Sequence, residues 1–158
     1  MNLTRVTTFV AVVVLGTSAA FAQASGAATP PASTPGPVDD LRRGIELFAN
    51  ARYAEALPVF DSLFLDPRSG NLRAEGAYWS AMTLLASGDP AAAEKVIESF
   101  LAAFPGHERT PEMMYHKARA AFLRKDYERA ISGFQSYLTA FPAGDQVSAS
   151  VFWSAECL

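Results

Sequence analysis

The sequence repeats one five-residue pattern three times: Tyr-Trp-Ser-Ala-Met at residues 78–82, Tyr-His-Lys-Ala-Arg at 115–119 and Phe-Trp-Ser-Ala-Glu at 152–156. Each copy starts 37 residues after the one before it. Two longer strings, Ser-Phe-Leu-Ala-Ala-Phe-Pro at 99–105 and Ser-Tyr-Leu-Thr-Ala-Phe-Pro at 136–142, keep the same spacing. A fixed period of this length predicts stacked structural repeats, because a unit this small cannot bury its own apolar side.

The same spacing relates residues of one size class along most of the chain. Small residues stand at positions 44, 81, 118 and 155, alanine stands at 56, 93 and 130, and large apolar residues stand at 60, 97 and 134 and at 63, 100 and 137. We expect each unit to be a pair of antiparallel helices whose small residues face each other and let the two axes approach closely. The large residues then fill the seam between helices and reach the next unit.

Local signals mark the helix ends in the second unit. Asn71 is expected to cap a first helix over residues 72–87, and Gly88 is expected to end it in a left-handed conformation. Asp89 then caps the second helix, and Pro90 takes the first helical position, where a missing N–H costs little.

The third unit repeats this arrangement with Thr110-Pro111-Glu112 at the start of its first helix and Asp126 at the start of its second. The second helices should end before Pro105 and Pro142, which cannot continue them. Pro58 breaks the rule, since it falls near the sixth position of the first such helix and should kink or loosen it.

The first 22 residues resemble a secretory signal, with Arg5, an apolar stretch over residues 6–16 and an Ala-Phe-Ala cleavage site ending at Ala22. An uncleaved membrane anchor is the alternative, but a span needs about 20 apolar residues. Residues 23–37 form a Pro/Ala-rich linker. We therefore expect a periplasmic or secreted protein with no transmembrane segment after cleavage.

The repeats are expected over residues 38–158, with units at about 38–70, 71–108 and 109–144 and a partial unit at 145–158. A formal net charge of −3 without clustered Lys and Arg argues against nucleic acid as a partner. No glycine-rich phosphate loop or paired metal ligands occur in the sequence, so we expect no catalytic residues, no metal and no cofactor, and not an enzyme.

The residues that catalysis most often uses are few. His107 is expected to be a solvated loop residue, and His116, Trp79 and Trp153 are expected to pack between repeats. Cys157 cannot form an internal disulfide, because it is the single cysteine. It is expected to behave as a small apolar side chain, with pairing between chains as the alternative.

The small residues at 44/81/118/155, the alanines at 56/93/130, the bulky residues at 60/97/134 and the closing prolines together resemble the tetratricopeptide repeat family. The repeats have a longer period than usual, and Phe-Leu-x-x-Phe-Pro is followed by an aromatic-rich helix. In both respects they are similar to the repeats of two kinds of periplasmic protein: the Tol-Pal-associated cell-division coordinator and, more distantly, the outer-membrane assembly lipoproteins. The resemblance implies an all-α fold, a short right-handed α-solenoid of about three and a half helical hairpins.

The resemblance also implies that the first helices of the units line a concave groove for a partner peptide. The corresponding partner-binding positions are Glu75, Tyr78, Met82, Glu112, Tyr115, Arg119, Phe122 and Phe152, with Leu85 and Glu156 beside them. Aromatic residues and arginine dominate binding hot spots, which favours this interpretation. The alternative is that Tyr78, Tyr115 and Phe152 simply pack between neighbouring helices.

We therefore predict an exported, non-enzymatic scaffold that binds a protein or peptide partner in the cell envelope. Two alternatives are an N-terminal regulatory region of a larger envelope enzyme or peptidoglycan-acting protein, and a chaperone-like binder of unfolded exported chains. Phe152 and Trp153 stand on a first helix with no second helix after it. This predicts either a fragment of a longer protein or self-association through the uncapped C-terminal helix.

Overall fold

A computed structural model describes residues 36–158 of the chain. This part of the chain forms seven α-helices, one short 3₁₀ helix and no strand. The helices are α1 (Pro37–Ala49), α2 (Tyr53–Leu65), η1 (Pro67–Ser69), α3 (Leu72–Ser87), α4 (Pro90–Ala103), α5 (Thr110–Leu123), α6 (Tyr127–Ala140) and α7 (Val147–Glu156). The predicted signal peptide and nearly all of the predicted linker lie outside the described residues.

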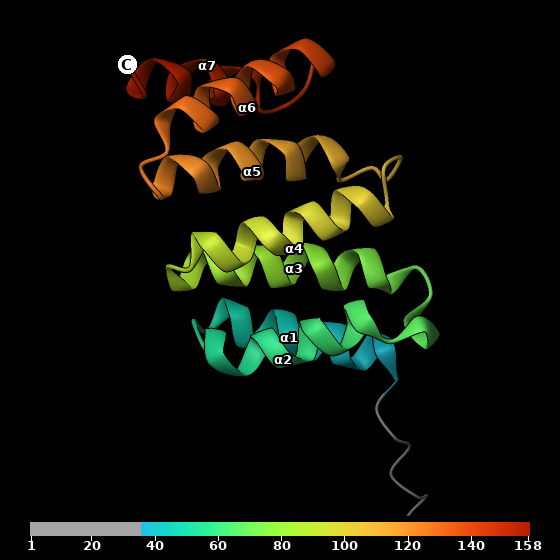
Figure 1. The fold of residues 1–158 in the computed structure, drawn as a ribbon. Coiled ribbons are helices and arrows are strands. Elements are labelled where there is room, and N and C mark those ends of the chain that lie inside the picture. The colour runs from blue at the N-terminus through green and yellow to red at the C-terminus, as the bar shows by residue number, and fades with distance from the viewer. Residues whose placement is uncertain (1–35) are drawn as a thin grey trace, which may run out of the picture. The chain divides into compact units, whose positions relative to one another are not determined.

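The helices stack in sequence order as antiparallel pairs, α1 with α2, α3 with α4 and α5 with α6, and α7 packs on α6 (Figure 1). The predicted all-α solenoid is therefore confirmed. Three helical hairpins and a single helix correspond to the three and a half units expected from the 37-residue spacing. Within the described residues, no helix combines the length and the apolar composition needed to cross a bilayer.

Several helix ends lie where the sequence predicts them. The Asp89 carboxylate accepts a hydrogen bond from the Ala92 amide at 2.9 Å, and Asp126 accepts one from the Arg129 amide at 3.3 Å. Gly88 ends α3 with φ of 87°, a conformation that other residues avoid. The ends of α4 and α6 precede Pro105 and Pro142 by two residues, as expected.

Asn71 is not the predicted side-chain cap of α3. Its backbone is already helical, with φ −65° and ψ −23°, and its side chain makes no capping hydrogen bond. A capping residue needs an extended backbone to turn its side chain onto the next amides. The chain instead enters α3 from the η1 turn, where the Arg73 amide donates to the Gly70 carbonyl at 3.2 Å.

Pro58 does not interrupt α2, which continues from Tyr53 to Leu65. The proline removes the amide that would bond to the Ala54 carbonyl, but both residues are exposed. Water can therefore solvate the free carbonyl, so the lost hydrogen bond is tolerated in this helix.

The core consists of the residues that the spacing selects. Phe60, Ile97 and Phe134 have no exposed surface, and Ala56, Ala93 and Ala130 have none either. Burying a large apolar side chain of this kind contributes about 1.5–3 kcal/mol to folding. The small partners matter as well, because a Cβ added at Gly44 would lie 2.5 Å from the Phe60 ring.

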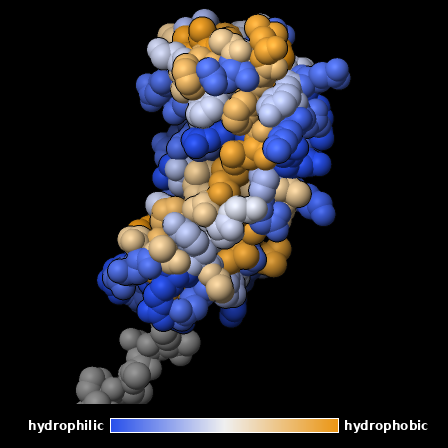
Figure 2. All heavy atoms as spheres, turned by 90° about the vertical axis from the view of Figure 1, so that its left-hand side faces the viewer, coloured by the Kyte–Doolittle hydropathy of each residue, from blue (hydrophilic) through white to orange (hydrophobic). Residues whose placement is uncertain are grey.

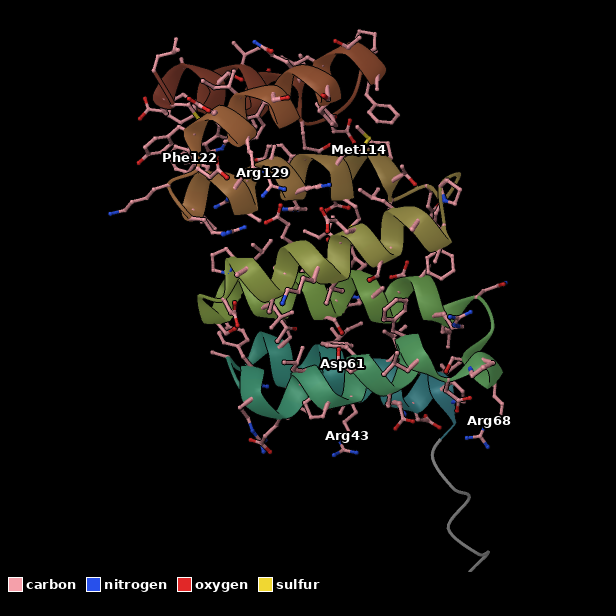
Figure 3. All side chains as sticks on the ribbon, in the orientation of Figure 1. Arg43, Asp61, Arg68, Met114, Phe122 and Arg129 are labelled. Atoms are coloured by element: carbon pink, nitrogen blue, oxygen red, sulfur yellow. The ribbon has the colours of Figure 1, made fainter. Side chains whose placement is uncertain are left out.

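The contact between α2 and α3, which we call the apolar junction, is close and largely apolar. A Cβ at Gly76 would lie 2.7 Å from the Phe64 amide nitrogen, so only glycine admits this approach. Trp79 stacks on Phe60 with ring centroids 5.8 Å apart. Two charged side chains also reach the contact. The Ser80 hydroxyl donates to Asp61 at 2.7 Å, and Arg73 Nε donates to the Phe64 carbonyl at 3.0 Å; Figure 3 shows Asp61 between α2 and α3.

Candidate functional site

A groove runs across the first helices of the repeats, and we call it the A-helix groove. It has a volume of about 490 Å³. Its lining comes from α1, α3 and α5 and consists of Phe48, Tyr78, Trp79, Met82, Leu85, Ala86, Glu112, His116, Arg119 and Leu123. The set is largely apolar, and Arg119 is its one permanent cation.

Helical spacing explains why these residues share one surface. Tyr78, Met82 and Leu85 are four and then three residues apart on α3, so they lie on one face. On α5 the same spacing aligns Glu112, His116, Arg119 and Leu123. Both helices end on the side of the stack drawn in Figure 2, where hydrophobic side chains form a band between hydrophilic ones.

A network of charged side chains closes one side of this groove and joins the second repeat to the third. Arg109, just before α5, contacts both carboxylate oxygens of Glu75 on α3, at 2.8 and 3.0 Å. It also reaches Glu112 at 3.3 Å, and its guanidinium lies 4.0 Å from the centre of the Tyr78 ring. The Tyr78 hydroxyl donates to Glu112 at 2.8 Å. We call the α4–α5 contact with its flanking charges the ionic junction.

Arg109 is special to this junction. The positions 37 residues before and after it are Leu72 and Gln146. Neither carries a positive charge that could pair with two carboxylates, so the spacing that builds the core does not repeat the network. Burial and the neighbouring Glu112 carboxylate raise the pKa of Tyr78 to about 12, which keeps its hydroxyl protonated as a donor.

Loop residues help to place Arg109. His107 was predicted to be solvated, but it is half-buried, with its ring edge-on to Phe100 at a centroid distance of 5.6 Å. Its Nδ1 accepts a hydrogen bond from the Arg109 amide at 3.3 Å. The prediction was wrong because apolar contact with α4, the preceding helix, holds the imidazole inside the turn.

His116 is the buried titratable group of the A-helix groove. Its Nε2 lies 3.7 Å from a Glu112 oxygen, and its Nδ1 is buried and finds no hydrogen-bond partner among the described residues. Burial lowers the pKa of His116, an effect that Glu112 opposes and Arg119 reinforces. The imidazole is therefore neutral at neutral pH.

The structure places the residues predicted for partner binding in different settings. Tyr78, Met82, Glu112 and Arg119 line the A-helix groove, together with Leu85. Glu75 lies beside it as a partner of Arg109.

The remaining predicted residues lie elsewhere. Tyr115 is buried against Phe134, Phe122 packs on Trp153 at a centroid distance of 4.9 Å, and Phe152 is 55% exposed on α7. Glu156, at the end of α7, is exposed too.

Sequence reasoning missed five residues of the groove lining: Phe48, Trp79, Ala86, His116 and Leu123. Phe48 could have been found, because it stands 37 residues before Leu85. Trp79 and His116 were assigned to packing between repeats. Trp79 does pack in this way, on Phe60 and Phe48, and it also presents part of its surface to the groove.

A second groove, not predicted from the sequence, lies across the second helices of the second and third repeats. We call it the B-helix groove. It has a volume of about 510 Å³ and is lined by Glu94, Leu101, Pro105, Thr110, Met114, Lys117, Ala118, Ala121, Arg129, Ser132, Gly133 and Ser136. At 100° per residue, its α5 residues lie on the face of that helix opposite to the A-helix groove. The α5 helix therefore forms part of both.

Charged side chains flank the B-helix groove as well. The Glu94 side chain is 8% exposed and pairs with Arg124 and with Arg129, the latter at 2.9 Å. Lys117 pairs with Glu98 at 2.9 Å.

In residues 36–158, no group of three His, Cys, Asp or Glu side chains could hold a metal ion.

Comparison with known proteins agrees with this architecture. A family model described as tetratricopeptide repeat matches residues 41–108 and again residues 78–145. The second match starts 37 residues after the first, the same spacing that relates the five-residue patterns. A search of curated proteins returned no match.

Proposed function

Because the chain belongs to the tetratricopeptide repeat family, we propose that it is an exported, non-enzymatic scaffold of the bacterial cell envelope that binds a partner protein in its A-helix groove. Repeats of this family generally mediate protein–protein interactions, so a protein partner follows from the family itself. The compartment, the groove and the lack of enzymatic activity are the proposal.

The composition of the A-helix groove supports its role as the binding surface. Met82, Leu85 and Trp79 offer apolar surface, and Leu123 is 46% exposed at the end of the groove. Arg119 has no carboxylate within ion-pair distance among the described residues, and it lies over the Trp153 ring at 5.6 Å. Apolar anchors beside a free guanidinium are typical of protein-binding hot spots.

The chemistry of the remaining nucleophilic and basic groups supports a non-enzymatic role. Burial and the neighbouring Glu156 raise the pKa of the Cys157 thiol, which disfavours the reactive thiolate at neutral pH. The Cys157 thiol donates to the Trp153 carbonyl at 3.0 Å, a contact within its own helix. His116 is held by burial on the far side of α5 from any hydroxyl of the B-helix groove.

The N-terminal sequence supports export. Arg5, the apolar stretch over residues 6–16 and the Ala-Phe-Ala motif ending at Ala22 have the pattern of a cleaved secretory signal. Similarity of the Phe-Leu-x-x-Phe-Pro motif to periplasmic repeat proteins of the Tol-Pal-associated type favours the periplasm. N-terminal sequencing of the protein from a periplasmic fraction should begin at Gln23, and recovery of the full chain in the cytoplasm would contradict export.

Groove binding can be tested with variants that keep the fold. Met82→Asp and Arg119→Glu change the A-helix groove, while Ser99→Asp changes an exposed residue that lines neither groove. Partners recovered with the wild-type protein from periplasmic extract should be lost with both groove variants and kept with Ser99→Asp. Equal recovery with all four proteins would remove the A-helix groove from the proposal, and recovery of many unfolded chains would favour a chaperone-like role.

A further inference from the structure

Two residues that line the B-helix groove are smaller than their counterparts in the earlier repeats. Leu47 and Leu84 have Ala121 as their counterpart, and Val59 and Val96 have Gly133. Leu84 is 8% exposed and Val96 packs against the core of the second repeat. Replacing a leucine and a valine by alanine and glycine removes six carbon atoms from these positions. At Gly133 the helices α5 and α6 approach closely, because an added Cβ would lie 2.8 Å from the Ala118 Cβ. The wall that remains is apolar at Leu101, Met114 and Ala121, so an occupant of this groove should supply an apolar side chain.

The accessible charge in the groove is positive. Its one carboxylate, Glu94, is 8% exposed and already pairs with two arginines. The lining cations are open to solvent, with the Lys117 and Arg129 side chains 39% and 54% exposed. Both also contact carboxylates outside the groove, Glu98 and Asp126. Spare N–H donors remain on both, because an ammonium has three and a guanidinium five. A carboxylate is the complementary group.

The apolar and cationic parts lie at different ends of the groove. Leu101 and Met114 line one end, and Arg129 lies beside Glu94 at the other. Figure 3 shows Met114 of α5 and Arg129 of α6 well apart in the direction of the helices. Along α4, Glu94 and Leu101 are seven residues apart, which corresponds to about 10 Å at 1.5 Å per residue. An extended peptide covers that length in about three residues, at 3.3 Å each.

We propose that the B-helix groove is a second binding site, which takes an extended segment of a partner protein with a branched apolar side chain and, three residues away, a carboxylate. The apolar side chain packs on Leu101 and Met114. The carboxylate pairs with Lys117 and Arg129. This site is independent of the A-helix groove, since the two use opposite faces of α5.

The test uses the full mature chain and a blocked tetrapeptide, acetyl-Leu-Ser-Ser-Asp-amide, titrated to millimolar concentration while backbone amide signals are followed by NMR. The amides of Met114, Lys117 and Ser136 should shift. Replacing the peptide's aspartate by lysine, or its leucine by serine, should weaken binding at least tenfold. Shifts confined to Met82 and Arg119, equal binding of the three peptides, or no shift at all would each overturn the proposal.

Two variants and one small acid sharpen the result. Ser136→Trp fills the groove from its exposed wall, and Lys117→Glu reverses one lining charge. Both should weaken peptide binding at least tenfold with an unchanged circular dichroism spectrum, and Met82→Asp should leave binding intact. The small acid is 4-methylpentanoate, which carries the same branched chain and carboxylate. If it binds as tightly as the peptide, the groove is a site for small carboxylic acids and the peptide proposal fails.

Discussion

The apolar junction between α2 and α3 and the ionic junction between α4 and α5 both stack one repeat on the next, but they use different chemistry. At the apolar junction Gly76 lets two backbones approach, and Phe60 and Trp79 fill the remaining space. At the ionic junction Arg109 and Glu94 connect the repeats through long side chains on opposite flanks. Both grooves described above adjoin the ionic junction.

The difference shows how a repeat protein can gain stability in one place and binding surface in another. Close apolar packing removes water and leaves no space for a ligand. Long charged side chains hold helices in register from the edges, and surface-accessible ion pairs contribute less per contact. The ionic junction should therefore be the weaker one and the one that binds.

The largest expected effect is at the apolar junction. Phe60→Ala removes a ring with no exposed surface and leaves a cavity beneath Trp79 and Gly44. We expect a loss of about 3–5 kcal/mol in the free energy of unfolding, measured by urea denaturation. Phe152→Ala is the control, because that ring is 55% exposed and its loss should change the midpoint little. Similar losses for both would contradict the assignment of the core.

Gly76→Ala tests the close approach of α2 and α3 directly. The added Cβ would meet the Phe64 amide nitrogen at 2.7 Å and the Phe60 carbonyl oxygen at 2.9 Å, neither of which can move freely. We expect a loss of about 1–3 kcal/mol by thermal denaturation, although alanine favours helix. At Gly106 the same substitution meets nothing within 4 Å and should leave Tm unchanged. A stable Gly76→Ala protein would show that this junction is looser than described.

Arg109→Ala tests the ionic junction. It leaves the Glu75 and Glu112 carboxylates, 21% and 30% exposed, without their shared cation. We expect a loss of about 1–2 kcal/mol, smaller at high salt because ion pairs at partly exposed sites are screened. Arg68→Ala is the matched control, since Arg68 pairs with Asp66 at the surface and points away from the stack in Figure 3. It should give no measurable change in Tm.

The smallest expected effect is the loss of thermal stability at low pH that His116 causes. Burial lowers the pKa of His116 below its usual 6.5, so the folded protein binds this proton less readily than the unfolded chain does. Its contribution to stability is therefore present above pH 6.5 and is lost as pH falls below that value. Tm measured from pH 7 down to about pH 5 should decline less steeply for His116→Leu than for the wild type. Equal slopes would show that another group controls the acid response.

The sequence predicted the features that depend on neighbours along the chain. Asp89, Asp126 and Gly88 act within one turn of their own helix, so local signals suffice to place them. The prediction that Asn71 caps α3 was wrong, because the η1 turn, and not the Asn71 side chain, determines how the chain enters α3. The prediction that His107 is solvated was wrong, because its contact with Phe100 depends on how the loop folds back on helix α4.

About half of the predicted binding residues line the A-helix groove, and the reason lies in the helix faces. The family resemblance assigned the same positions to every repeat, so it grouped Tyr115 with Tyr78. The two tyrosines differ because Glu112 and Arg109 hold Tyr78 at the edge of the groove, while Tyr115 packs on Phe134.

By itself the sequence determined the helical hairpins, their order and their core, because these follow from a spacing of 37 residues and from helical periodicity, which any stretch of the chain expresses locally. The tertiary structure alone decided the ionic junction, the B-helix groove and which of the predicted residues line the A-helix groove. Tyr78–Glu112 and Glu75–Arg109 join residues 34 apart, and Glu94–Arg124 joins residues 30 apart. Such pairs do not follow the repeat, since they depend on where the ends of long side chains meet after the helices have packed.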